Sequence, residues 1–135
     1  WIEVHWAVLL DNRDGDFGAA APHYDTALDI ALATGDGILE SIVIRHTAQQ
    51  EQEAGKRIAM FRRSLHLRAA AGIRHQTLAA QAALAYNLPE GDPERAVLME
   101  TFRAGAQELR IGWLLSDDEA RNSAGDPDPA DADRG

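Results

Sequence analysis

Two histidines in matching tetrapeptides are the side chains best suited to acid–base or metal chemistry. Residues 4–7 (VHWA) align with residues 45–48 (RHTA), which places His5 and His46 at the same point of successive predicted helices, ~10 Å apart. With Glu40 and Arg45 they would form a pocket for a metal, a small molecule or an acid–base reaction. The chain has no HExxH-type spacing. We therefore favour a structural role for both histidines, and expect no catalytic residue, no metal ligand and no cofactor.

A basic segment is the second candidate. It contains Arg57, Arg62, Arg63 and Arg68, with His66 between them. These side chains could meet an anionic partner or the acidic region of another copy, or they could pair with acids of the same chain, which we favour. Nucleic acid is not the expected partner, because the net charge is −9 and no aromatic residues interleave with the arginines.

The composition indicates one all-α domain. The 135 residues are 45% hydrophobic and rich in alanine, the strongest helix former. There is no cysteine, and no apolar run approaches the ~20 residues that a membrane helix needs. We expect a cytoplasmic protein without a membrane partner.

The arginine-rich, lysine-poor usage is typical of GC-rich bacteria, and the start at Trp1 inside a helical pattern favours a fragment of a longer protein.

Apolar periodicity, turn residues and proline positions predict six helices. They cover residues 1–10, 20–34, 37–54, 56–71, 74–87 and 93–109. Residues 113–115 are apolar and are expected to cover the last helices. Residues 116–135 are acidic and read as a flexible tail.

One segment recurs with a period of 37 to 38 residues. Residues 27–36 return as 64–73 and, more weakly, as 102–111. Gly35 and Gly72 stand where a helix must stop, and Arg110 takes that place in the third copy. A repeat of this length is typical of stacked helical hairpins.

The hairpins resemble tetratricopeptide repeats over residues 1–111. The resemblance rests on small residues in the first helices, on hairpin glycines, and on packing positions in the second helices. These are Ala7, Ala48 and Ala85; Gly55 and Gly91; and Ala27, Ser64 and Ala106, with residues 92–96 matching the start of a second helix. The resemblance implies a short right-handed α-solenoid within residues 1–115, with hairpins over 1–36, 37–73 and 74–111.

In the resembled family the first helices line a concave face that holds a peptide or partner. Mapped by the small position, this face carries Arg45, Gln49, Gln52 and Tyr86, with His5 and His46 nearby. An arginine beside an aromatic wall could clamp an extended chain or a carboxylate. The alternative is an ordinary solvated helix face.

The predicted first helix carries Trp1, Ile2 and Trp6. An apolar patch of this kind attracts partners and could join two copies of the chain. Together these features predict a protein–protein interaction or scaffolding module of a bacterial regulatory protein, binding a peptide or partner on the concave face. The alternative is a small-molecule-binding helical protein or enzyme that uses the His5/His46 pocket.

Overall fold

The structure is a computed structural model that describes residues 1–5, 7–8 and 15–112. Every regular element in this part of the chain is a helix, which confirms the predicted all-α class. Five helices follow a helical N-terminal segment (residues 2–5 and 7–8). They are α2 (Phe17–Thr34), α3 (Gly37–Ala48), α4 (Ala54–Ala70), α5 (Arg74–Asn87) and α6 (Pro93–Glu108). The predictions for Trp6, residues 113–115 and the acidic tail lie outside the described residues.

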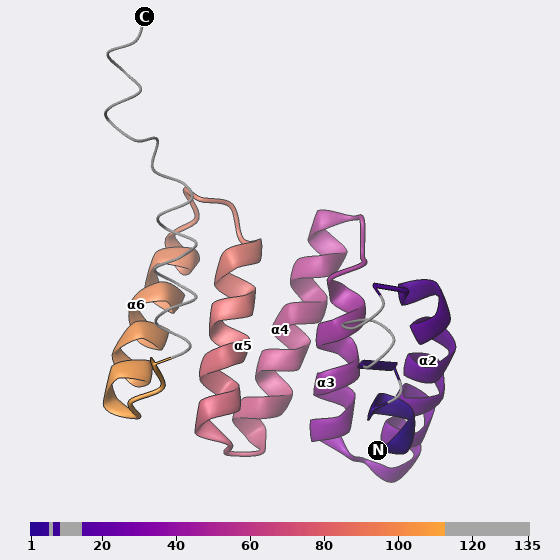
Figure 1. Ribbon diagram of the computed structural model, residues 1–135. Helices are drawn as coiled ribbons and strands as arrows, with labels where there is room; N and C mark the ends of the chain where they lie inside the picture. The colour runs from indigo at the N-terminus through magenta and orange to yellow at the C-terminus, as the bar shows by residue number, and fades with distance from the viewer. Residues whose placement is uncertain (6, 9–14, 113–135) are drawn as a thin grey trace, which may run out of the picture.

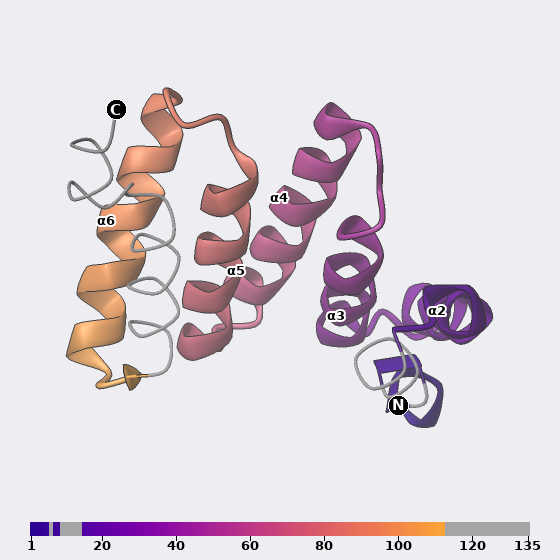
Figure 2. The ribbon, with the colours of Figure 1, turned by 45° about the horizontal axis from the view of Figure 1, so that its top comes forward.

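The helices stand in a row that follows their order in the chain (Figure 1). Extensive packing joins α2 to α3, α3 to α4, α4 to α5 and α5 to α6. A second view shows α3 to α6 side by side, with α2 turned so that it is seen nearly along its axis (Figure 2). None of the described helices combines the length and apolarity that a membrane crossing requires.

Short polar side chains begin three of these helices. The carboxylates of Asp16, Asp36 and Asp92 accept hydrogen bonds from backbone N–H groups of α2, α3 and α6. Each satisfies one of the N–H groups that a helix start leaves without an intrahelical partner. Because Asp16 caps α2, this helix begins three residues before its predicted start.

The recurring helix stop is a left-handed residue in all three copies. Gly35 and Gly72 have φ of 69° and 71°, a region open to glycine at little cost. Arg110 has φ of 54° at the matching position. Beside it the Ile111 N–H bonds the Ala106 carbonyl at 2.9 Å, as the Asp36 N–H bonds Ala31 at 3.0 Å. The third copy therefore keeps the stop without its glycine.

The predicted end of the third helix at residue 54 is wrong. The helix ends at Ala48, and residues 49–53 form a loop. Side chains in this loop compete for the backbone: Glu51 accepts from the Glu53 N–H, and Glu53 accepts from the N–H groups of Gly55 and Lys56. Gly55 thus lies in the first turn of α4 and does not end the preceding helix.

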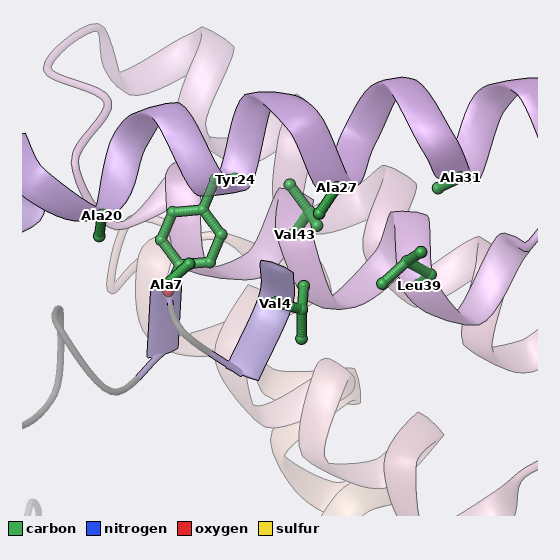
Figure 3. Close-up of a cluster of buried hydrophobic side chains, with 8 residues drawn as sticks. All are labelled: Val4, Ala7, Ala20, Tyr24, Ala27, Ala31, Leu39 and Val43. Carbon is green, nitrogen blue, oxygen red and sulfur yellow. The ribbon is translucent and has the colours of Figure 1, made fainter. Parts of the chain in front are cut away.

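The core divides into clusters between successive helices. The cluster of the N-terminal segment, α2 and α3 is drawn in Figure 3, where the Tyr24 ring lies beside Ala7. The predicted small positions Ala7, Ala48 and Ala85 are fully buried. Helical periodicity would also bury Leu32, Ala69 and Ala96, but all three are exposed. These residues lie at the margin of their helices' apolar faces, where periodicity alone defines burial poorly.

Candidate functional site

Two arginines from different helices share one buried region. Arg68 of α4 is only 4% exposed. Its Nε donates to Ser41 Oγ of α3 at 3.3 Å, and its Nη1 donates to the Gln76 carbonyl of α5 at 3.4 Å. Both hydrogen bonds are at the long end of the normal range. Arg68 of α4 therefore contacts both α3 and α5, but these two long hydrogen bonds hold its guanidinium group only weakly.

Arg45 of α3 is the second member of this arginine pair (Arg45 and Arg68). Its side chain is half-buried, and its Nε is buried without a hydrogen-bond partner among the described residues. Its charge acts on Arg68 and contributes to lowering the pKa of that guanidinium.

No carboxylate compensates the arginine pair within the described part of the chain. The ion pairs there use other basic side chains. Burial lowers the pKa of Arg45, and burial followed by the charge of Arg45 lowers the pKa of Arg68 to about 10. Burial is the larger cause for both, because a cation taken out of water without an anion nearby is destabilised.

The local sequence explains this placement. Ser41 and Arg45 lie one turn apart on α3, as Ser64 and Arg68 do on α4. The Ser64 hydroxyl donates to the Ser41 carbonyl at 2.9 Å and fixes the two turns side by side. The arginines consequently face the same region. Guanidinium groups with unused N–H donors bind carboxylate or phosphate oxygens, often through two parallel hydrogen bonds.

The expectation that Arg68 pairs with an acid of the same chain is wrong, since it is buried and bonds Ser41 and the Gln76 carbonyl. Its neighbours Arg62 and Arg63 are at the surface and pair within the chain, as we expected for this segment. Arg62 binds Glu94 of α6 through both terminal nitrogens, and Arg63 binds Glu40 of α3 at 3.1 Å. The hydrogen bonding between Arg62 and Glu94 raises the pKa of Arg62 and lowers the pKa of Glu94.

The other residues assigned to the concave face occupy separate places. Gln49 is the exposed C-cap of α3. Gln52 lies in the following loop and bonds the Gln50 carbonyl at 3.1 Å, so its predicted place on a helix is wrong. Tyr86 is half-buried on α5 and packs edge-on against Phe102 of α6. Only Arg45 of this set takes part in the arginine pair.

The residues of the predicted histidine pocket make contacts with different partners. His5 is exposed, and its Nδ1 lies 2.9 Å from the Trp1 carbonyl of its own turn. His46 stacks on the Tyr24 ring of α2 with centroids 5.6 Å apart. Glu40 is engaged by Arg63. Within the described ranges, no three His, Cys, Asp or Glu side chains gather as a metal site would require.

A histidine that the sequence did not single out forms a hydrogen bond at this end of the molecule. His23 Nδ1 of α2 lies 2.6 Å from a carboxylate oxygen of Glu3. The pair joins the N-terminal segment to α2 at the surface. Trp1 and Ile2 are 50% and 75% exposed beside it, so the predicted apolar patch is accessible at these two residues.

Comparison with family models, with curated proteins and with solved structures gives no match to this chain.

Proposed function

We propose that the chain is a protein-interaction module that binds a peptide or partner protein on the face around Arg45. In this proposal the helices form a short right-handed α-solenoid of hairpins 1–36, 37–73 and 74–111, resembling tetratricopeptide repeats. The module would serve a bacterial regulatory or scaffolding protein of the cytoplasm.

The packing order of the helices is the observation that carries this proposal. Each described helix packs extensively only on the helices that precede and follow it in the chain. In such one-dimensional stacks every hairpin keeps a face that the rest of the protein does not cover, and these faces together make an extended binding surface. A compact bundle would instead bury most of them.

Arg45 supports the choice of face. It is half-buried on α3, retains an unsatisfied N–H donor, and lies one turn before the exposed Gln49. A partly desolvated arginine with free donors contributes more to binding than a fully solvated one, because less hydration is lost on contact. The end of α3 thus combines an anchoring cation with accessible polar groups.

A peptide selection tests the proposal. A displayed library of random peptides is selected on the immobilised chain, and the affinity of enriched peptides is measured by fluorescence anisotropy. Charge reversal in Arg45→Glu should weaken binding by about tenfold or more. Arg74→Glu is the matched control, since Arg74 is an exposed arginine of α5 paired with Glu108. Its binding should stay near that of the wild type.

The same peptides separate the interaction module from the alternative, a small-molecule-binding protein or enzyme that uses the His5/His46 pocket. His46→Ala should leave peptide affinity unchanged in an interaction module. The module is refuted if no peptide is enriched, or if enriched peptides bind Arg45→Glu as tightly as the wild type.

A further inference from the structure

The last hairpin shows how this fold fills the space between its two helices with apolar side chains. Four positions of α5 and α6 contribute to one buried cluster. They are Leu78, Ala82, Phe102 and Ala106. Leu78 and Ala82 lie seven and three residues before the small position Ala85. Phe102 and Ala106 are the first and fifth residues of the third copy of the recurring segment.

The middle hairpin carries polar residues at the same four positions. They are Ser41, Arg45, Ser64 and Arg68, counted in the same way from Ala48 and from the second copy of the recurring segment. The first copy agrees with the last, because Ala31 stands where Arg68 does and is 1% exposed. The middle hairpin therefore has two serines and two arginines where the last hairpin has an apolar contact.

Packing explains the volume of these side chains but not their charge. Ser41 and Ser64 stand where the last hairpin has the larger Leu78 and Phe102, so the long arginine side chains can fill the space that the serines leave, and an apolar side chain could do the same. Burying two like charges without a counter-ion is unfavourable. Water can accept hydrogen bonds from the unused N–H groups, but it cannot neutralise the charge. A bound anion can do both.

We propose that Arg45 and Arg68 bind the phosphate group of a ligand. This rests on the proposed function to the extent that the phosphate belongs to a phosphorylated partner peptide. A phosphate monoester carries close to two negative charges at neutral pH and matches two cations. A single carboxylate would leave one buried charge uncompensated. Arg45 is half-buried and so partly exposed to solvent, while Arg68 is almost fully buried and donates to Ser41.

Inorganic phosphate tests the site without a partner. Isothermal titration at low salt should show phosphate binding to the wild type, with acetate at equal concentration binding far more weakly. Arg45→Gln should lose about tenfold or more in phosphate affinity, the usual scale for one charge-assisted contact. Arg74→Gln, which changes an exposed and already paired arginine, should bind phosphate as the wild type does.

Arg68→Met provides a second variant, because it keeps much of the side-chain volume and removes the charge. Far-UV circular dichroism establishes that each variant is folded before its titration. Loss of phosphate binding in folded Arg68→Met supports the pair. The proposal is overturned if the wild type gives no phosphate-dependent heat, if folded Arg45→Gln binds phosphate equally well, or if acetate binds as tightly.

A phosphoserine peptide library and its unphosphorylated counterpart distinguish the source of the phosphate. Preferential binding of phosphopeptides, lost in Arg45→Gln, supports a phosphorylated partner. Binding of inorganic phosphate without any peptide preference assigns the site to a small phosphorylated ligand and refutes the peptide source. Arg45-dependent binding of unphosphorylated peptides, with no phosphate binding, refutes the phosphate site and leaves the interaction module standing.

Discussion

At the scale of single residues, Arg68 is the least expected side chain of the chain. Arginine is mostly exposed in folded proteins, and we grouped Arg68 with Arg62 and Arg63 in one basic segment. The structure buries it because the aligned positions Ala31 and Ala106 are core positions. Position within the repeat, and not residue type, was the signal that could have identified it.

Replacing Arg68 should stabilise the free protein. Arg68→Met removes a buried, repelled charge whose two hydrogen bonds are long, and we expect the free energy of unfolding to rise by about 1–2 kcal/mol at pH 7. Urea denaturation followed by circular dichroism measures this. A loss of stability of similar size would instead identify Arg68 as a structural residue.

The stability difference between wild type and Arg68→Met should depend on pH in a defined direction. Below pH 10 Arg68 is protonated in both the folded and unfolded states, so the whole cost of its burial is present. Above about pH 10 the folded state loses this proton before the unfolded state does, because the pKa of Arg68 is lowered on folding. Wild-type stability then rises relative to that of the variant. Denaturation of both proteins at pH 7, 9 and 10.5 should show the gap narrowing at the highest pH.

Arg110 offers a prediction at the recurring helix stop. A left-handed conformation costs a non-glycine residue about 1–2 kcal/mol, of which glycine's greater freedom in the unfolded state cancels part. Arg110→Gly should therefore stabilise the protein by about 0.5–1 kcal/mol in thermal or urea unfolding. Gly72→Ala, with φ of 71° at the matching stop, should destabilise it. Unchanged stability in both variants would contradict the assignment of this conformation.

At the scale of elements, the sequence predicted the helices better than their ends. The fifth helix was predicted with the bounds that it has, because Gly72 precedes it and Pro89 follows it. The end of α3 was missed because the carboxylates of Glu51 and Glu53 accept hydrogen bonds from nearby backbone N–H groups in the loop that follows the helix. Side-chain competition of this kind depends on rotamers, which a periodicity does not contain.

Asp36 is the element-scale residue whose role can be tested most simply. Its carboxylate accepts a hydrogen bond from the Leu39 N–H at 2.9 Å at the start of α3, the helix that carries Arg45. Asp36→Ala should cost about 1 kcal/mol, whereas Asp36→Ser should retain most of the stability. Equal losses in both variants would show that the cap contributes nothing beyond its backbone conformation.

At the scale of the whole molecule, each helix packs mainly on its neighbours in the chain, so a destabilising substitution should affect mainly the helices next to it. Phe102 of α6 is fully buried and contacts Tyr86 of α5. Phe102→Ala should cost about 3–5 kcal/mol. Hydrogen exchange followed by mass spectrometry should show faster exchange first in α5 and α6, with α2 and α3 still protected. A uniform loss of protection over all helices would indicate a single cooperative core.

The candidate site was predictable only in part, for a reason that belongs to this scale. Arg45 was identified because the spacing from Ala48 placed it on the first helix of a hairpin. The partnership with Arg68 depends on how two helices are rotated against each other, which the Ser64–Ser41 hydrogen bond fixes. Gln52 and Tyr86 share a predicted face with Arg45, but in the folded chain they contact the loop after α3 and the α6 surface.

The side-chain Nε–H signals of the arginines report most directly on the central claim that Arg45 and Arg68 form one anion-binding site. A ¹⁵N-labelled sample is titrated with phosphate and then with a phosphoserine peptide, and the arginine Nε–H cross-peaks are followed by NMR. We predict that the Arg45 and Arg68 signals shift together along one binding curve, while the signal of Arg74 stays in place. Shifts of equal size at all arginines, or no shift at Arg45 and Arg68, would contradict the account.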